Sequence, residues 1–511
     1  MSLNSDSRTV NAGKNAISAL INKFCILLLT FIGRKIFIQY IGIEYLGING
    51  LFYNILTLLS MADLGLGTAM NVSLYKPIAE NDIRKLSALL NYFRQIYCFI
   101  AIAVTVIGFA IIPFLPYIVN VDSEIPHLYL YYVVFVLKNT VSYLFVYKSS
   151  IINADQKNYL VNNIGVFVNF FRIIIQIIFV IITKNYLIYI IIDLFSVIIH
   201  NVAISKIADK QYPFIIQKYK LSIKERNIIF SDIYSAFLYK VSGSILGGTD
   251  NILISIIVGT VAVGLYSNYQ TITSNLETVI MLLFTSLTAG IGNLVATSDN
   301  EKKYSTYRVM QMVGNWLGSY ISICLFFLME DFIVLWLDKE MLLDSSVLVA
   351  VVINMYYTIC MRPVWTFREG TGMYRQIRYI MFAAAFINIV LSILFGRIYG
   401  IGAILIATSI AKFSTCFWYE PNVLFKKFFA MKPCYYYIDY FKNIFFTLFL
   451  GFICYIPMRF INRISFLNWF VKALICTIIV NVLSFFRYHK TQEFKDIKRK
   501  LKGLLKFWKR N

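Results

Sequence analysis

The sequence predicts an all-α polytopic membrane protein. Of its 511 residues, 59% are hydrophobic and only 14% are charged, whereas charged residues make up about 25% of an average soluble chain. Apolar runs of about 20 residues recur from one end of the chain to the other, and each is long enough to cross a bilayer as a helix. The runs are continuously apolar rather than alternating, which excludes a transmembrane β-barrel.

Fourteen apolar segments are expected to be transmembrane helices. They lie near 15–40, 44–70, 92–118, 127–150, 160–183, 186–206, 228–256, 261–292, 308–330, 345–366, 378–397, 399–424, 439–460 and 465–486. The second, seventh and eighth segments are the least apolar of the set.

The charges of the connecting loops predict the orientation of these helices. Basic residues gather in alternate loops, which the positive-inside rule assigns to the cytoplasm. They are Lys76, Arg84, Lys85, Lys157, Lys206, Lys210, Lys218, Lys220, Lys224, Arg226, Lys302, Lys303, Arg368, Arg375, Arg378, Lys426, Lys427 and Lys432. The opposite loops carry far fewer, so both termini are predicted to be cytoplasmic. The net charge of +22 is thereby explained by membrane topology, and nucleic acid is not an expected partner.

The two halves of the chain resemble each other at a shift of 217 positions. The shift aligns, among others, Lys23 with Lys240, Gly42 with Gly259 and Gly47 with Gly264. An interval of six spans preserves orientation, so two six-helix lobes form a parallel repeat, with the substrate expected between them. The predicted divisions are an N-terminal lobe 1–206, a basic cytoplasmic linker 207–227, a C-terminal lobe 228–424, two extra helices 425–486 and a basic amphipathic tail 487–511.

The tail carries ten Lys or Arg residues and two acidic residues. Its apolar residues recur at three- and four-residue spacing, as in a helix that lies on an anionic membrane surface. We expect it to be a topology anchor, with docking of a partner as the alternative.

Neither cysteines nor histidines predict a metal or cofactor. The eight cysteines include no C-x-x-C pair, and the three histidines are scattered along the chain. Seven of the cysteines lie in apolar segments, where they are expected to act as small hydrophobic residues. No metal ligand, cofactor or catalytic residue is therefore predicted.

Charged residues inside the apolar segments are the candidates for a functional site, because a charge at the bilayer centre costs about 2.5–3.5 kcal/mol. The basic candidates for substrate binding are Lys23, Arg34, Lys35, Lys138, Arg172 and Lys240. The acidic candidates for ion coupling or charge pairing are Asp63, Asp193 and Asp250. The excess of basic residues in the first six spans indicates an anionic ligand, and phosphate suits it because Arg and Lys bind phosphate by charge-assisted hydrogen bonds.

Each candidate also has a purely structural interpretation. Arg34 and Lys35 lie near the end of their span and could extend their charges to the interface. Asp193 could simply neutralise a neighbouring cation, and Asp63 could mark a glycine-associated bend. Lys240 and Asp250 stand ten residues apart, about 15 Å along one helix, so they cannot pair with each other.

Three motifs resemble the oligosaccharide-flippase (Wzx-like) branch of the multidrug/oligosaccharidyl-lipid/polysaccharide exporter superfamily. They are Gly33–Gly47 with sequence GRKIFIQYIGIEYLG, Ala62–Gly67 with ADLGLG, and Gly248–Ser255 with GTDNILIS. The resemblance implies a non-enzymatic flippase in the bacterial inner membrane. Its cargo would be an undecaprenyl-diphosphate-linked oligosaccharide for capsule, exopolysaccharide or O-antigen synthesis, moved by alternating access. A polysaccharide polymerase and its assembly machinery are the partners that this function implies.

Three alternatives remain at this point. A lipid II flippase would share the fold and the diphosphate-lipid cargo. A small-molecule exporter of organic cations would need an acidic or aromatic cavity, which the basic residues of the first half disfavour. A membrane glycosyltransferase or polymerase would need a sizeable outer loop for its catalytic residues, and the sequence has none of that length.

Overall fold

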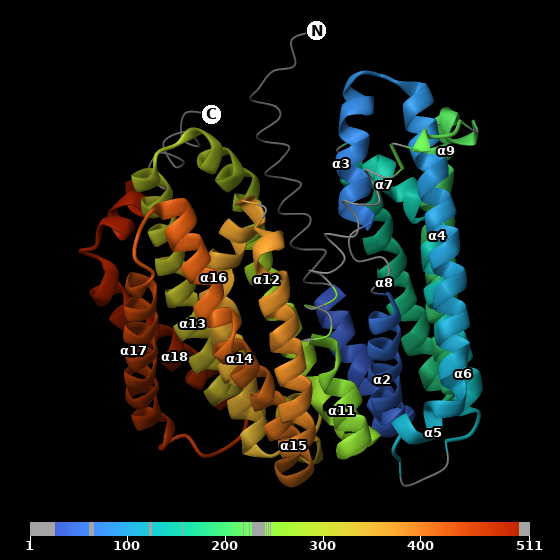
Figure 1. Cartoon of the computed structure of the whole chain (residues 1–511). Coiled ribbons are helices and arrows are strands. Elements are labelled where there is room, and N and C mark those ends of the chain that lie inside the picture. Colours follow the sequence, from blue (N-terminus) through green and yellow to red (C-terminus); the bar gives the residue numbers. More distant parts are fainter. Residues whose placement is uncertain are drawn as a thin grey trace, which may run out of the picture. The chain divides into compact units, whose positions relative to one another are not determined.

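The computed structural model describes residues 26–60, 66–121, 125–155, 157–217, 219–223, 225–226, 247–371 and 373–499, with three isolated residues between 241 and 245. The described residues form helices and no strand (Figure 1). They belong to two compact units, Met1–Gly264 and Leu265–Asn511.

The first unit begins with a helix at 26–40. It continues with α2 (Ile43–Leu59), α3 (Leu66–Ala79), α4 (Ile83–Ile111), α5 (Leu115–Ile118), α6 (Leu128–Tyr143), α7 (Val146–Ala154), α8 (Asn158–Thr183), α9 (Tyr186–Gln211) and α11 (Asp250–Ile257). Side-chain caps fix two of these starts: Asp82 accepts the backbone N–H of Lys85 at α4, and Asn185 accepts that of Leu187 at α9. Such caps satisfy N–H groups that have no partner within the helix.

Two predicted spans of the first unit each contain more than one described helix. The segment predicted at 127–150 is α6 followed by α7, bent by 41° at the break between them. The segment predicted at 44–70 comprises α2 and the start of α3, with residues 61–65 outside the described part. The apolar pattern carried no signal for the bend between α6 and α7.

The segment that follows α9 packs against α4 within the same unit. A 3₁₀ helix at Pro213–Ile216 follows α9, and the side-chain amide of Asn91 donates to the Gln217 carbonyl at 2.6 Å. Lys85 pairs with Glu225 at 3.2 Å. Hydrogen bonds from Ser222, together with Lys85, lower the pKa of the Glu225 carboxyl below its usual value. The part of the predicted linker that the structure describes is thus held on α4.

The first turns of α2 and α12 (Thr260–Thr297) cross at two glycines. A Cβ on Gly47 would lie 2.1 Å from the Thr260 carbonyl oxygen, and a Cβ on Gly264 would lie 2.5 Å from that of Ile43. The contact is reciprocal, because Thr260 and Gly264 are Ile43 and Gly47 shifted by 217 positions. Only residues without a side chain permit helices to approach this closely.

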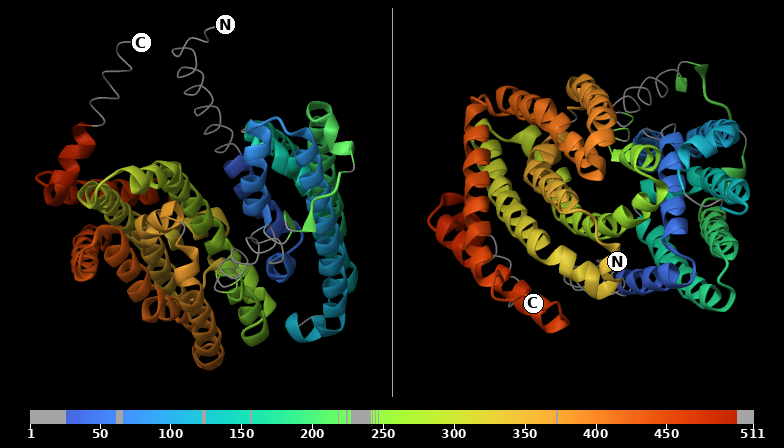
Figure 2. Two further views of the ribbon diagram at one scale, coloured as in Figure 1. Left: turned by 45° about the horizontal axis from the view of Figure 1, so that its top comes forward. Right: turned by 90° about the horizontal axis from the view of Figure 1, so that it is seen from below.

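The second unit is built around α13. Its helices are α13 (Asn300–Trp336), α14 (Ser345–Thr371), α15 (Tyr374–Ser414), α16 (Cys416–Leu424), a π-helical turn at Phe425–Phe429, α17 (Cys434–Met458) and α18 (Phe466–Tyr488), together with most of α12. Figure 2 shows α13, in yellow, beside the orange-red α17 and α18. Beyond α18, Glu493 pairs with Arg308 of α13 at 2.6 Å. The described part of the predicted tail is therefore joined to α13 by an ion pair.

Helix α15 is a hairpin of two helices. Gly400 has φ 68° and ψ −149°, which interrupts the helical conformation. The Asn388 amide donates to the Thr408 hydroxyl at 2.7 Å, so residues on either side of Gly400 face each other. The apolar stretch Gln376–Phe429 has 54 residues, about 81 Å of helix and far more than the roughly 30 Å of one hydrocarbon core. The break lies where the sequence predicted the end of one span and the start of the next.

Within the described residues, eight helices are long and apolar enough to span a membrane, or nine if the bent pair α6–α7 is one span. This confirms an all-helical membrane protein. The total of fourteen spans remains a prediction, because parts of the first, second and seventh predicted segments lie outside the described residues.

A buried ion pair inside the second unit differs from the sequence-based expectation. Arg368, expected in a cytoplasmic loop, lies in the last turn of α14 and donates to Glu420 of α16 at 2.9 Å. The two side chains are only 8% and 2% exposed. The guanidinium also lies 5.6 Å from the Trp365 ring centre. The loop assignment was wrong because charge counting cannot recognise a cation whose partner lies 52 residues away.

We expect Arg368→Ala to destabilise the second unit by about 3–5 kcal/mol, because it leaves the Glu420 carboxylate buried without its partner. The double variant Arg368→Met/Glu420→Leu should recover most of this loss, since it removes both charges. Thermal unfolding of the purified protein in detergent measures both effects. Equal destabilisation by the single and the double variant would show that the side chains stabilise the second unit by packing and not by their charge pairing.

Candidate functional site

Three helices of the first unit are joined by one carboxylate inside the predicted membrane region. Asp193 of α9 accepts a hydrogen bond from Lys138 of α6 and pairs with it. Its other oxygen accepts from Arg172 of α8 at 3.2 Å. The three side chains are 19%, 27% and 23% exposed, respectively. The structure thus brings together three of the charges singled out from the sequence.

Two amides hold the Arg172 guanidinium in place. Its Nε donates to Asn169 at 3.1 Å, and its Nη1 donates to Gln176 at 2.9 Å. Asn169 and Gln176 stand three and four residues from Arg172, so all three share one face of α8. The Gln176 amide in turn donates to the Tyr189 carbonyl of α9 at 3.0 Å.

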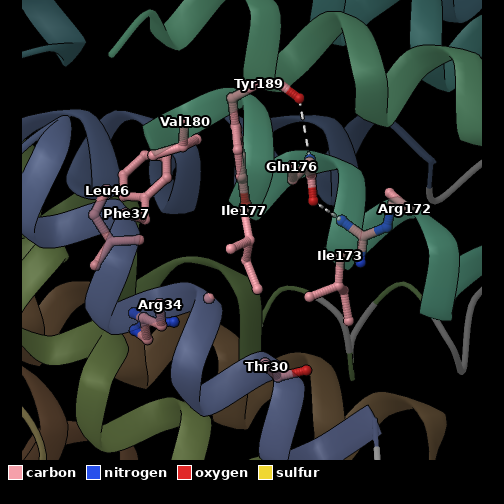
Figure 3. A pocket seen from close by; sticks show the side chains of 11 residues that line it. Thr30, Arg34, Phe37, Leu46, Arg172, Ile173, Gln176, Ile177, Val180 and Tyr189 are labelled. Atoms are coloured by element: carbon pink, nitrogen blue, oxygen red, sulfur yellow. Dashed lines mark hydrogen bonds between the residues drawn. The ribbon is translucent and has the colours of Figure 1, made fainter. Parts of the chain in front are cut away.

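Arg34 faces Arg172 across a cavity (Figure 3). The helix at 26–40 contributes Arg34 and Thr30, α8 contributes Arg172 and Gln176, and α9 contributes Tyr189. The cavity volume is about 110 Å³, enough for several waters, each of which needs about 10–15 Å³. Figure 3 shows the hydrogen-bonded chain from Tyr189 through Gln176 to Arg172 on one side and Arg34 on the other.

Among the described residues of this cluster, basic side chains outnumber acidic ones. Arg34, Lys138 and Arg172 are basic, and Asp193 is acidic. The surplus lies among helices, where charge–charge interactions are screened less than at an aqueous surface. An anion with several oxygen acceptors would complement it, because guanidinium and ammonium groups bind phosphate oxygens by charge-assisted hydrogen bonds. The arrangement can therefore hold a phosphate or diphosphate group.

The remaining predicted residues lie elsewhere. Lys35 is exposed and does not line the cavity. Asp250 is buried in the first turn of α11 and does not line it either. Lys23, Asp63 and Lys240 lie outside the described residues.

Other charged pairs of the helical bundle were not singled out by the sequence analysis. Lys148 pairs with Asp209 at 2.7 Å, and Lys472 pairs with Asp331 at 2.6 Å. Each lies near the end of a helix, where single charges are common and carry no sequence signal.

Tyr189 was also missed, because a tyrosine in so aromatic a chain is uninformative by itself. Among the described residues, no group of three His, Cys, Asp or Glu side chains could hold a metal ion.

No protein-family model matches the chain, and no curated protein matches its sequence. Solved structures do match its fold. The lipid II flippase MurJ in an inward closed conformation superposes with a TM-score of 0.69, covering 93% of this chain and 99% of that chain at 18% identity. The chain shares the fold of this flippase. An inward-facing multidrug resistance transporter of the MATE family, described as a member of the MOP superfamily, superposes with a TM-score of 0.60, covering 77% of this chain and 93% of that chain at 15% identity.

A third solved structure has a lower TM-score. A transporter from Pyrococcus furiosus, described as having a binding pocket of reversed polarity, superposes with a TM-score of 0.50. It covers 78% of this chain and 92% of that chain at 15% identity. Because all three identities are low, the similarity shows the fold alone.

Proposed function

We propose that this protein is a flippase for a saccharide linked to a polyprenyl diphosphate, which it moves across the bacterial inner membrane by alternating access. The observation that carries the proposal is the cavity of the first unit that Arg34 and Arg172 line from opposite sides. Arg172 also shares the Asp193 carboxylate with Lys138. A diphosphate presents a dense set of oxygen acceptors to these donors. The MOP fold supports a transporter rather than an enzyme.

Two cargoes share this headgroup chemistry. The similarity to the lipid II flippase supports a lipid II-type cargo. The sequence motifs Gly33–Gly47 and Ala62–Gly67 support an oligosaccharide repeat unit for capsule, exopolysaccharide or O-antigen synthesis. The cavity favours both over an organic cation, because its surplus charge would repel a cationic drug.

Headgroup accessibility in proteoliposomes tests the proposal. Purified protein is reconstituted with lipid II or with a diphosphate-linked oligosaccharide, and an enzyme that modifies the sugar is added outside. We expect protein-dependent modification of lipid that started in the inner leaflet, and the preferred cargo identifies the branch. Folded protein that flips neither lipid, across several repeat units, would contradict the proposal and favour a small-molecule exporter.

In the same assay, we expect Arg34→Ala and Arg172→Ala each to lower the initial flipping rate about tenfold or more. Hydrogen bonds to charged groups contribute about 1.5–3 kcal/mol, and 1.4 kcal/mol corresponds to a factor of ten. Arg397→Ala is the matched control, because this exposed arginine lies on α15 in the other unit. Full transport by both cavity variants, at normal protein levels, would remove them from the binding site.

A further inference from the structure

Arg172 lies between two different hollows of the first unit. On one side it lines the polar cavity with Arg34 and Gln176. On the other side it lines a groove of about 400 Å³ between α8 and α9. The rest of this groove is almost wholly apolar, with Phe167, Phe171 and Ile175 contributed by α8.

The side chains of the groove point outward rather than into a packed core. Phe167 is 64% exposed and Phe195 is 57% exposed. Phe171 and Ile199 are exposed as well. Aromatic and aliphatic surface of this extent is unfavourable against water but compatible with hydrocarbon. The groove therefore suits a lipid chain better than a polar ligand.

The groove and the cavity together have the two parts that a phosphorylated lipid requires. Phe167 and Ile175 are eight residues apart on α8, so this wall of the groove is about 12 Å long. Arg172 lies within that length and is shared with the polar cavity. A cation at the junction complements a phosphate, and the apolar wall accommodates the chain attached to it.

We propose that the α8–α9 groove holds the first isoprenoid segment of a polyprenyl diphosphate while its diphosphate occupies the cavity at Arg172. The inference rests on the proposed function and adds a binding site for the lipid chain. A flippase must move a polar headgroup through protein while the chain stays in hydrocarbon. A residue that borders both environments allows the two to remain connected during transport.

Chain-length dependence of binding tests the groove. The full-length protein in nanodiscs is titrated with farnesyl diphosphate and with dimethylallyl diphosphate, which shares the diphosphate but has a much shorter chain. Uptake by protein-free nanodiscs is subtracted. We expect the wild type to bind farnesyl diphosphate about tenfold more tightly or better, because the longer chain buries more apolar surface in the groove.

The variant Ile199→Trp fills the groove without altering the charged cluster. It should reduce the affinity for farnesyl diphosphate to that for dimethylallyl diphosphate and leave the latter unchanged. Ile182→Trp is the matched control, because Ile182 is exposed on α8 but does not line the groove. Photo-crosslinking of the wild-type protein is an independent test. Farnesyl diphosphate that carries a diazirine at the end of its chain should label peptides of α8 and α9.

The outcomes separate this inference from the proposed function. If both diphosphates bind equally and in an Arg172-dependent way, the groove proposal is overturned and the cavity proposal stands. Labelling that avoids α8 and α9, or a chain preference that Ile199→Trp leaves intact, also overturns the groove. If neither diphosphate binds folded protein, both proposals fail. A second copy of the protein could cover these phenylalanines instead of a lipid chain. In that case the protein would be dimeric and the diazirine would not label α8 and α9, and this result would also overturn the lipid assignment.

Discussion

Gly47→Ala and Gly264→Ala are expected to disrupt the crossing of α2 with the first turn of α12. Each added Cβ would lie 2.1 Å or 2.5 Å from a backbone carbonyl oxygen, far inside van der Waals contact. The backbones must separate, because neither obstacle is the end of a flexible side chain. Overpacking of this kind costs about 1–3 kcal/mol and occasionally more. A lower unfolding temperature and a lower yield of detergent-stable protein would measure the loss.

Gly50→Ala is the control on the same helix. Among the described residues, its Cβ would meet only the Val263 side chain, at 3.4 Å. Replacing a glycine inside a helix by alanine gains about 0.5–1 kcal/mol where no clash opposes it. Gly47→Ala should therefore lower the stability of the protein, and Gly50→Ala should raise it. A Gly47→Ala protein as stable as Gly50→Ala would contradict the close approach of these backbones.

Asp193→Ala is expected to have the second large effect. The substitution removes the carboxylate that joins α6, α8 and α9 and leaves Lys138 and Arg172 as neighbouring like charges. Breaking a buried pair by removing one partner costs about 3–5 kcal/mol. We expect reduced membrane-inserted protein and a lower unfolding temperature even before transport is measured.

The double variant Lys138→Met/Asp193→Leu tests the cause of that loss. It conserves the net charge of the cluster and leaves Arg172 its amide partners Asn169 and Gln176. Stability should recover in large part, because replacing a buried ion pair by apolar residues is often neutral. If the double variant is as unstable as Asp193→Ala, the loss arises from packing at Asp193 and not from unpaired charge.

The sequence predicted the class of fold, and it singled out three charged residues that the structure brings together, for reasons that can be named. Continuous apolar runs require helices in a membrane, and the break between two predicted spans falls at Gly400, where the helix is interrupted. The aligned pairs Gly42 with Gly259 and Gly47 with Gly264 lie at equivalent turns, since Gly42 and Gly259 both have positive φ. Charge inside a span marked Lys138, Arg172 and Asp193 as unusual before any geometry was known.

The remaining features depend on which helices are neighbours, and single-span patterns do not contain that information. Lys138 and Asp193 are 55 residues apart in sequence, and nothing local to either residue indicates the other. Arg368 and Glu420 are likewise far apart in sequence. For that reason the buried Arg368 was interpreted as a charge in a loop. The 41° bend between α6 and α7 falls at Leu144 and Phe145, which are both apolar, so hydropathy could not reveal it.

The central claim is that the cavity between Arg34 and Arg172 recognises the diphosphate of the cargo. The most direct measurement compares the flipping of a diphosphate-linked saccharide lipid with that of a lipid carrying the same saccharide on a neutral linkage. Both are measured for the wild type and for the double variant Arg34→Gln/Arg172→Gln. We predict that the wild type strongly prefers the diphosphate lipid and that the double variant loses this preference. Equal rates for the two lipids in the wild type, or an unchanged preference in the variant, would contradict the account.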